Sequence, residues 1–398
     1  MSTTAIRDKF EAFASVLNAE NINRQDEVEA LQVAIVARGH IFFISKPGNG
    51  KTFVSNRTVM RILGIVYFYI LLTKWTADQE MFGPYSLPDL RNSGVYHRLT
   101  KGYLPEAHIA FIDEIWKGSS AMTNALLGAT NERRIRNGAD EIDIPLSTLI
   151  CASNELPDAE HDQCAAIYDR IDLRLEVADL EDGDDLYAML SLDIDPNPAP
   201  ILTWDEIVVA QQEAAALPVT PEAKWAMVAM KRKLADQGIR ISPRRLERAK
   251  VIARGAAWLA GADKVEVEHL EILRHMFWDT PDQRPVAERV VAEIASPLRK
   301  EVLEVSDITA GIEKDFAEVR GLDDHDQGRG TAILELQKKS QRTMDSALDL
   351  EDRVSGTSAR SLAAVIRRLN VMYAQMVLDV MGMEGGMTLY ESRRNDHR

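Results

Sequence analysis

The chain has 398 residues, of which 45% are hydrophobic and 27% are charged, and this length predicts two or three globular domains of about 150 residues each. Its 47 Lys and Arg residues against 62 Asp and Glu residues give a formal net charge of −15. A surface of this sign repels phosphate backbones and anionic lipid headgroups. Bulk coating of nucleic acid is therefore excluded as the main activity.

The cysteine content and the apolar runs indicate the compartment. The two cysteines, Cys151 and Cys164, are too few for a disulfide framework or a zinc site. The N-terminal segment lacks the apolar centre of a signal peptide. The longest apolar run, 62–72, is well short of the roughly 20 residues that span a bilayer. We therefore expect a cytoplasmic protein with no membrane span.

Apolar periodicity predicts an α/β domain in the first half of the chain. Residues 1–40 repeat apolar side chains at three- and four-residue spacing, which is typical of helix. Short apolar runs at 40–44, 65–72, 109–112 and 149–152 predict strands, and the segments between them are long enough for helices. Alternating strands and helices predict a parallel sheet up to about residue 180.

A break in composition follows the predicted sheet. Residues 176–195 contain eight acids and no Lys or Arg, and they lead into the proline-rich stretch 196–200, so we place a domain boundary there. Beyond it the pattern is almost entirely helical, starting with a capping box at 203–206. The predicted parts are an α/β domain at 1–195, a helical unit at 196–280, and a C-terminal helical module with a frayed tail at 281–398.

The segment 45–52, Ser-Lys-Pro-Gly-Asn-Gly-Lys-Thr, follows the first predicted strand and matches the phosphate-loop pattern G-x-x-x-x-G-K-[ST] except at the first glycine. Glycines in such a loop let backbone amides point at a polyphosphate on a helix N-terminus. Lys51 would reach the β- and γ-phosphates, and Thr52 would bind Mg²⁺. A glycine-rich turn with a chance Lys-Thr pair remains the alternative, because Ser45 replaces the first glycine. The predicted nucleotide-binding residues of this loop are Pro47, Gly48, Asn49, Gly50, Lys51 and Thr52.

Polar side chains also end the next two strands that we expect beside this loop. Asp113 and Glu114 follow the apolar run 109–112, and Asn154 follows the run 149–152. Asp113 suits the Mg²⁺ shell, and Glu114 is positioned to polarise the attacking water as a general base. The alternative for the two acids is an acidic strand end in a turn. The phosphate loop favours the catalytic interpretation.

Four arginines lie outside these strand ends. Arg170 and Arg174 stand near the end of the predicted sheet domain, and Arg244 and Arg245 stand at a helix start in the next unit. An arginine supplied to a transferring phosphoryl group stabilises its negative charge. We assign this role to Arg170 and Arg244, and we interpret Arg174 and Arg245 as arginines on a solvated face that pair with nearby acids.

With these residues in view, the sequence resembles the MoxR group of AAA+ ATPases, with RavA-type members as its nearest look-alikes. The resemblance covers roughly residues 20–280 and thins to a helical pattern beyond them. The segments that carry it are 85–90, 94–107, 111–117, 131–138, 152–157 and 168–170.

The resemblance implies an ATP- and Mg²⁺-dependent ATPase that forms a hexameric ring and acts with a protein partner, usually one with a von Willebrand factor A domain. Asn154 would be the first sensor, and Arg170 the finger that reaches into the neighbouring subunit. Arg244 would be the second sensor, on a helical lid formed by the unit at 196–280. Arg24 and Gln25 resemble the entry to the adenine pocket. The segments 94–102 and 136–143 would be exposed to substrate or partner.

The leading hypothesis is a ring-forming ATPase that couples Mg-ATP hydrolysis to remodelling or assembly of a partner protein. The alternative is a nucleic-acid-directed AAA+ motor, for which the basic stretches 133–136 and 240–248 could be cited. The net charge disfavours that alternative. A small-molecule kinase with a phosphate loop leaves the lid, Asn154 and Arg170 unexplained, and the sequence lacks the Asn-Lys-x-Asp motif that recognises guanine.

Overall fold

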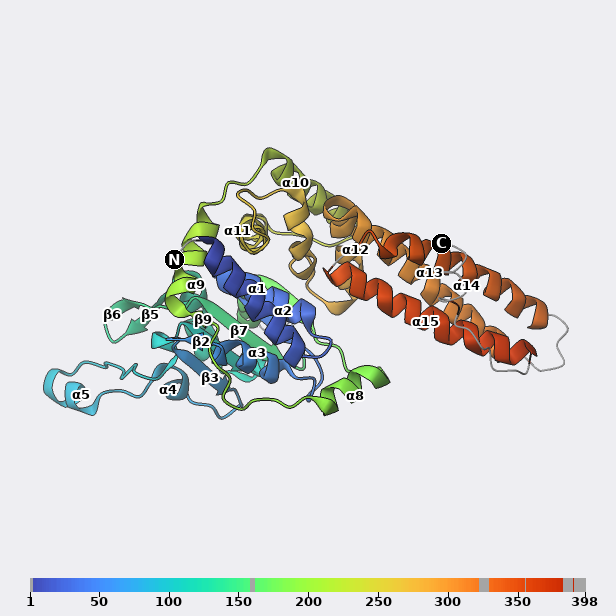
Figure 1. Ribbon diagram of the computed structural model, residues 1–398. Helices are drawn as coiled ribbons and strands as arrows, with labels where there is room; N and C mark the ends of the chain where they lie inside the picture. Colours follow the sequence, from blue (N-terminus) through green and yellow to red (C-terminus); the bar gives the residue numbers. More distant parts are fainter. Residues whose placement is uncertain (1–2, 158–161, 322–328, 355, 382–388, 390–398) are drawn as a thin grey trace. The chain divides into compact units, whose positions relative to one another are not determined.

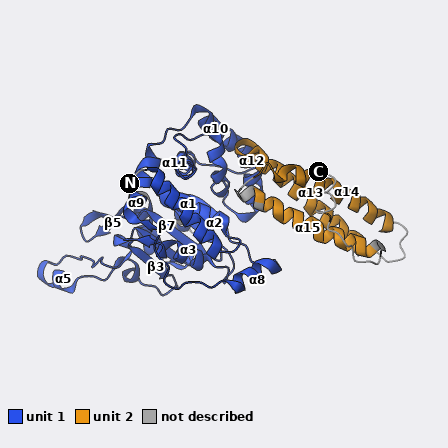
Figure 2. Cartoon of the chain, viewed as in Figure 1, with its two compact units in different colours: residues 1–291 blue, residues 292–398 orange. Residues whose placement is uncertain are grey.

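The computed structural model describes residues 3–157, 162–321, 329–354, 356–381 and 389. The chain divides into two compact units, Met1–Val291 and Ala292–Arg398 (Figure 2). The sheet and the predicted phosphate loop belong to the first unit. The second unit is helical (Figure 1).

The first unit is built on a five-stranded sheet in which every neighbouring pair of strands is parallel. Its strand order is β3-β4-β7-β1-β8, so the first strand lies at the inside of the sheet, as expected for a strand that is apolar on both faces. The fold class and the four predicted strands are confirmed. The strands are β1 (Ile41–Ile44), β3 (Tyr67–Leu71), β4 (Ile109–Asp113), β7 (Thr148–Ser153) and β8 (Leu173–Glu176).

The sequence does not predict β8, and the reason is Arg174. This side chain interrupts the apolar run of a four-residue strand, yet it is completely buried. Its guanidinium donates to the carbonyl oxygens of Tyr168 at 2.7 Å and Met276 at 3.2 Å and lies 4.3 Å from the centre of the Tyr168 ring. Both partners lie outside the strand, and Met276 is 102 positions away, so the strand pattern does not contain them.

Helices follow or precede the strands and cover the sheet (Figure 1). The helical pattern predicted over 1–40 is two helices, because the chain turns at Asn23, which has a φ of 54°. Helix α2 packs on β1 and β8. Helices of this part are α1 (Thr3–Glu20), α2 (Gln25–Val36), α3 (Lys51–Met60), α6 (Ser120–Asn131), α7 (Asp162–Arg170) and α8 (Gly183–Ser191).

Two insertions extend from the sheet domain. The first, between β3 and β4, holds α4 (Asp78–Phe82), α5 (Leu87–Ser93) and the 3₁₀ turn η1 (Leu104–Glu106). The second is an antiparallel hairpin of β5 (Arg134–Asn137) and β6 (Asp140–Asp143), between α6 and β7. The 3₁₀ turn η2 (Ile115–Lys117) directly follows β4.

The remainder of the first unit is helical. The predicted capping box is confirmed, because the Thr203 hydroxyl accepts from the Glu206 amide while the Glu206 carboxylate accepts from the Thr203 amide. The short strands β2 (Ile62–Leu63) and β9 (Leu202–Thr203) pair with each other, and the helix that begins at Trp204 directly follows β9 in the chain. The other elements are α9 (Trp204–Ala216), α10 (Pro221–Asp236), α11 (Pro243–Leu259), η3 (Val267–His275) and η4 (Pro281–Gln283).

The second unit is a bundle of three long helices, entered through α12 (Arg284–Ala295), which spans the division between the units. Its core consists of apolar side chains that all three helices contribute. Most of the predicted loop 321–330 and the predicted frayed tail lie outside the described residues. The bundle helices are α13 (Pro297–Arg320), α14 (Arg329–Glu351) and α15 (Gly356–Met381). Across the described residues, none of the helices combines the length and the apolar character needed to cross a bilayer.

Candidate nucleotide-binding site

The predicted phosphate loop connects the carboxyl end of β1 to the start of α3. Gly48 and Gly50 have φ values of +93° and +82°, a backbone region that side chains rarely adopt. A Cβ atom built on either glycine meets nothing within 4 Å, so backbone conformation rather than crowding requires glycine. The loop opens at the helix N-terminus, where amides can bind an anion.

Ser45 departs from the phosphate-loop pattern without requiring an unusual backbone. Its φ is not positive, and its hydroxyl donates to the carbonyl oxygen of Lys46 at 2.9 Å. The carbonyl oxygen of Ser45 accepts a hydrogen bond from Lys51 Nζ at 3.0 Å. The first position of this loop therefore does not need glycine.

Lys51 stands at the centre of the polar contacts below the loop. Besides Ser45, its Nζ atom donates to the carbonyl oxygen of Ser153 at 3.2 Å and to Asn154 Oδ1 at 3.1 Å. Burial lowers the pKa of the ammonium, and the charges of Asp113 and Glu114 offset part of that shift. The predicted loop lysine and the predicted first sensor are thus in direct contact.

Asp113 ends β4 and contacts Thr52, the first residue of α3 after Lys51, through a side-chain hydrogen bond. Its Oδ1 atom also accepts from the Glu114 amide at 3.0 Å. Burial raises the pKa of this carboxyl, and the nearby Lys51 charge opposes the rise. A hydroxyl and a carboxylate oxygen are therefore side by side where the loop ends.

Glu114 adopts a left-handed backbone with a φ of 54°, which is strained for a residue with a side chain and is common at functional sites. Its Oε2 atom forms an ion pair with Lys117 Nζ at 3.1 Å. Lys117 is not among the predicted site residues. The spacing of Glu and Lys three residues apart at the start of a helical turn is the signal for this contact.

These oxygen donors fit Mg²⁺. The described residues hold no group of three or more His, Cys, Asp or Glu that would enclose a metal. Mg²⁺ usually keeps several waters and is bound by one or two protein oxygens together with substrate phosphates. Thr52 and Asp113 supply such oxygens next to a phosphate loop.

Of the two residues predicted on the adenine side, Arg24 has hydrogen bonds that place it beside the phosphate loop. Arg24 is buried and donates to the carbonyl oxygens of Asn49 at 3.3 Å and Ala178 at 2.7 Å. Asn49 Nδ2 in turn donates to the carbonyl oxygen of Val177 at 3.2 Å. Arg24 therefore joins the phosphate loop to the segment after β8. Gln25 begins α2 and is half-buried.

Arg170 and Arg244 lie together, away from the phosphate loop. Both line a cavity of about 120 Å³ with His40, the residue before β1. No residue of the loop 45–52, all of which is described, lines this cavity. Because β1 has four residues and a strand rises about 3.3 Å per residue, the strand alone separates the two places by about 13 Å. The arginines are at the amino edge of the sheet, and Lys51 is at the carboxyl edge.

The guanidinium of Arg170 is only partly satisfied within the chain. Its Nη1 atom donates to the carbonyl oxygen of Ala166 at 2.8 Å, whereas its Nε atom is buried without a hydrogen-bond partner in the described residues. Burial lowers the pKa of Arg170, and the charge of Arg244 lowers it further. Two arginines held this close favour an anion between or beside them.

Arg174 and Arg245 are ion-paired within the chain as predicted, but both side chains are buried, so the prediction that they lie on a solvated face is wrong. Arg245 pairs with Asp279 at 2.7 Å and Asp169 at 3.4 Å, and Arg174 lies 3.8 Å from the same Asp279. These contacts fasten α11 and the start of η4 to the segment around α7. Arg174 and Arg245 are therefore held by carboxylates of the same chain.

The comparisons with known proteins agree with this geometry. Residues 8–211, more than half of the chain, match the family model of the MoxR domain in MoxR-vWA-beta-propeller ternary systems. Residues 225–291 match the AAA lid domain.

Similar proteins occur in Methanocaldococcus jannaschii. One uncharacterized protein is 33% identical over 311 residues, which is 78% of this chain and 81% of the relative. A second is 34% identical over 267 residues, which is 67% of this chain and 70% of the relative. The crystal structure of a proposed ATPase from Cytophaga hutchinsonii shares the fold, with a TM-score of 0.59 at 15% identity over 73% of this chain and 96% of that one. The loop, the strand-end acids and the two family matches lead to one conclusion: the chain belongs to the MoxR-type AAA+ ATPases.

Proposed function

We propose that this chain is a cytoplasmic, ring-forming ATPase that couples Mg-ATP hydrolysis to remodelling or assembly of a partner protein. The observation that carries the proposal is the separation of Arg170 and Arg244 from Lys51 across the sheet. A nucleotide at the loop of one chain would meet these arginines only from a neighbouring copy. Hydrolysis would then depend on assembly.

At the carboxyl edge the proposed roles follow from the contacts. Lys51 and the loop amides bind the phosphates, and Asn154, through its contact with Lys51 Nζ, orients the γ-phosphate or the water. Thr52 and Asp113 are the oxygen donors for Mg²⁺. When bound, Mg²⁺ neutralises charge that develops on the phosphate oxygens. The Glu114 carboxylate separates from Lys117 and then takes the proton of the attacking water.

At the amino edge Arg170 and Arg244 act on the nucleotide of the next subunit. An interface in which one surface meets a different surface of the neighbour generates a closed ring when the rotation closes. We propose a homo-hexamer on this basis and on the family. In this arrangement the three predicted parts, 1–195, 196–280 and 281–398, are the nucleotide domain, the lid that carries Arg244, and a module of open purpose. The resemblance to RavA-type members stays a prediction.

The partner is a protein in this proposal. The matching family model is named for systems in which MoxR occurs with a von Willebrand factor A domain and a beta-propeller, which supports such a partner. The alternative of a nucleic-acid motor is disfavoured by the net charge of −15. ATPase stimulation by DNA or RNA that weakens with salt would favour that alternative instead.

The Glu114→Gln variant tests the proposal. We expect nucleotide binding to persist while the steady-state rate of ATP hydrolysis falls about 10²- to 10⁴-fold, since general-base catalysis contributes that much. Nucleotide binding is measured by calorimetry with Mg-ATP, and assembly by analytical ultracentrifugation in the same buffer. The matched control is Glu155→Gln, an exposed acid beside Asn154, which should hydrolyse ATP at the wild-type rate.

Unchanged turnover in Glu114→Gln would contradict the assigned base. A hydrolysing protein that stays monomeric with ATP would contradict the ring. Affinity purification of the tagged Glu114→Gln chain from its native cell, with and without ATP, then identifies the partner that is retained in the ATP state.

A further inference from the structure

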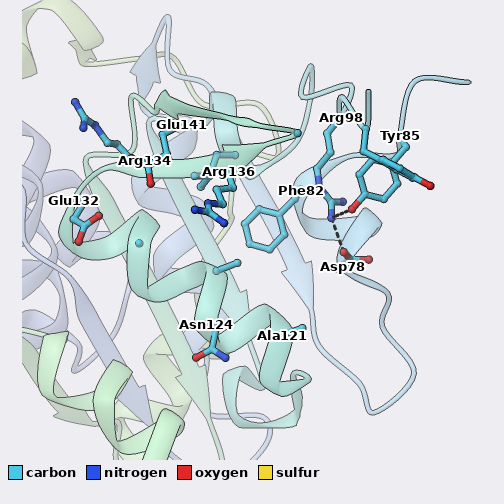
Figure 3. Close-up of a pocket in the computed structure, with 15 residues that line it drawn as sticks. Asp78, Phe82, Tyr85, Arg98, Ala121, Asn124, Glu132, Arg134, Arg136 and Glu141 are labelled. Carbon is cyan, nitrogen blue, oxygen red and sulfur yellow. Dashed lines mark hydrogen bonds and ion pairs between the residues drawn. The ribbon is translucent and has the colours of Figure 1, made fainter. Parts of the chain in front are cut away.

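A cavity of about 530 Å³ lies outside the nucleotide site, between the two insertions and helix α6 (Figure 3). Its volume falls within the range of about 300–1,000 Å³ that is usual for ligand pockets. The insertion that holds α4 and α5 forms one wall, the β5–β6 hairpin forms the other, and α6 forms the floor. None of the residues assigned to the nucleotide lines it.

The walls are held in place by specific contacts. Arg98 donates to Asp78 Oδ2 at 2.6 Å and to the Tyr85 hydroxyl at 2.7 Å, as the dashed lines in Figure 3 mark. Gly83 has a φ of +92°, and a Cβ atom there would lie 2.0 Å from the Leu99 carbonyl oxygen, so only glycine permits this close approach. The first wall is therefore a built structure.

The two walls are also joined to each other. Asn137, at the end of β5, accepts from the Arg98 amide through Oδ1 at 2.6 Å and donates to the Arg98 carbonyl oxygen through Nδ2 at 3.4 Å. This pairing imitates a strand ladder between the hairpin and the insertion. The space between the walls and the floor is therefore maintained without a ligand to support it.

The floor consists mainly of short side chains, together with the polar Asn124. Helix α6 presents Ala121, Ala125 and Gly128 at spacings of four and three residues, which places them on one face of the helix. Phe82 closes the back of the cavity and is 4% exposed. Small side chains on one side and an aromatic ring on the other leave room for an apolar side chain of a ligand.

Among the described residues, two of the three arginines that line the cavity are ion-paired, and the third is not. Arg98 is satisfied by Asp78, and Arg134 pairs with Asp143 at 2.7 Å. Arg136 has no hydrogen bond or ion pair with any described residue, although its cross-strand neighbour is Glu141. In Figure 3 the guanidinium of Arg136 points toward the ring of Phe82. A cation and an apolar surface thus face the same space.

We propose that this cavity binds an extended segment of a partner protein in which one carboxylate side chain stands next to an apolar one. Arg136 pairs with the carboxylate in the bidentate geometry that guanidinium favours, and the apolar side chain packs between Phe82 and the face of α6. Glu132 and Glu141 also line the cavity, which disfavours a nucleic acid or another polyanion. The inference rests on the proposed function, because a remodelling ATPase needs a place to hold its client.

The test uses the full chain and two fluorescein-labelled peptides, Gly-Ser-Leu-Asp-Leu-Ser-Gly and the same peptide with Asn in place of Asp. Fluorescence anisotropy reports binding without any need for ATP hydrolysis. We expect the Asp peptide to bind at least about tenfold more tightly than the Asn peptide, the scale of one charge-assisted pair. Equal binding of the two peptides would overturn the proposal, as would binding of neither.

Substitution of Arg136 locates the contact. Arg136→Glu should weaken binding of the Asp peptide by at least about tenfold, and it should bind a third peptide, with Lys in place of Asp, more tightly than the wild type does. The matched control is Arg91→Glu, which makes the same charge change in the other insertion, at an exposed residue that does not line the cavity. Ala121→Phe, which fills the floor from an exposed position, should weaken both the Asp and the Asn peptides.

Other outcomes separate this inference from the proposed function. Wild-type ATPase activity without peptide binding would overturn the inference and leave the ATPase proposal standing. Peptide binding by a chain that does not hydrolyse ATP would do the reverse. A fluorescent single-stranded oligonucleotide that binds the wild type and is lost in Arg136→Glu would overturn the inference in favour of nucleic acid.

Discussion

A carboxylate at each edge of the parallel sheet has a shifted pKa, and the two shifts are in opposite directions. At the carboxyl edge burial raises the pKa of Asp113 and lowers that of Lys51, and their mutual attraction offsets only part of each shift. At the amino edge burial also acts to raise the pKa of Asp172, yet hydrogen bonds from Arg248 and from the His40 amide bring it below its ordinary value. The charges at the carboxyl edge are incompletely stabilised, whereas the Asp172 network at the amino edge is complete.

The difference distinguishes the ligand site around Lys51 and Asp113 from the structural network around Asp172. Asp172 accepts from Arg248 Nε at 2.8 Å and Nη2 at 2.7 Å, and from His40 N at 2.9 Å. His40 is satisfied as a neutral ring, because Nε2 donates to the Thr130 carbonyl oxygen and Nδ1 accepts from the Leu149 amide. This network fixes helix α11, which also carries Arg244. Perturbed, incompletely paired groups are instead typical of functional sites.

The largest expected effect is the loss of ATP hydrolysis when Arg170, at the amino edge, is replaced. In Arg170→Ala we expect ATP hydrolysis to fall about 10³-fold or more, because an arginine supplied to the phosphoryl group contributes about that factor. Binding of Mg-ATP should change little, since Arg170 lies at the other edge from the loop. Hydrolysis and calorimetric binding measured on the same preparation test both statements. Equal losses of binding and turnover would contradict the assignment.

A smaller effect concerns the structural network. Asp172→Asn should destabilise the chain by about 3 kcal/mol, because removal of one partner from a buried ion pair leaves the other poorly compensated. Chemical denaturation followed by circular dichroism measures the change. The matched control is Asp143→Asn, whose ion pair with Arg134 is exposed, and it should change stability by less than about 1 kcal/mol. Similar losses in both variants would remove the contrast between buried and exposed pairs.

The smallest effect depends on pH and concerns Glu27, in the first turn of α2. Burial raises the pKa of Glu27 to about 7. A carboxyl with a raised folded-state pKa stabilises the protein fully below its unfolded pKa of about 4.5, and this stability is lost as the pH rises through about 7. The stability of Glu27→Gln relative to the wild type should therefore rise by about 2.5 kcal/mol between pH 5 and pH 8. Melting temperatures at pH 5 and pH 8 measure it, and a constant difference between the two chains would contradict the raised pKa.

The sequence predicts the carboxyl edge well because its signals are local. The loop 45–52 and the acids at 113 and 114 are contiguous patterns, and parallel strands deliver them and Asn154 to one edge. The sequence does not predict the amino edge, because its contacts join distant residues: Arg248 and Asp172 are separated by 76 positions, and Arg174 and Met276 by 102. The proximity of Arg170 and Arg244 depends on that packing.

The cavity between the insertions also has no local signal. Arg136 belongs to a hairpin that the family resemblance marks as exposed, and nothing in the pattern distinguishes it from Arg134. The distinction arises because Arg134 finds Asp143 as a partner, whereas Arg136 faces Phe82 (Figure 3). A sequence pattern cannot supply the direction of a side chain relative to another insertion.

The central claim is that each nucleotide site takes its arginines from a neighbour, and a mixing experiment tests it most directly. Arg170→Ala and Lys51→Ala chains are each expected to be inactive. In equal mixtures about a quarter of the interfaces in a random ring would combine an intact loop with an intact arginine. The account predicts that ATPase activity returns in such mixtures to a corresponding fraction of the wild-type rate. Mixed rings, detected by mass photometry, that remain inactive at every ratio would contradict it.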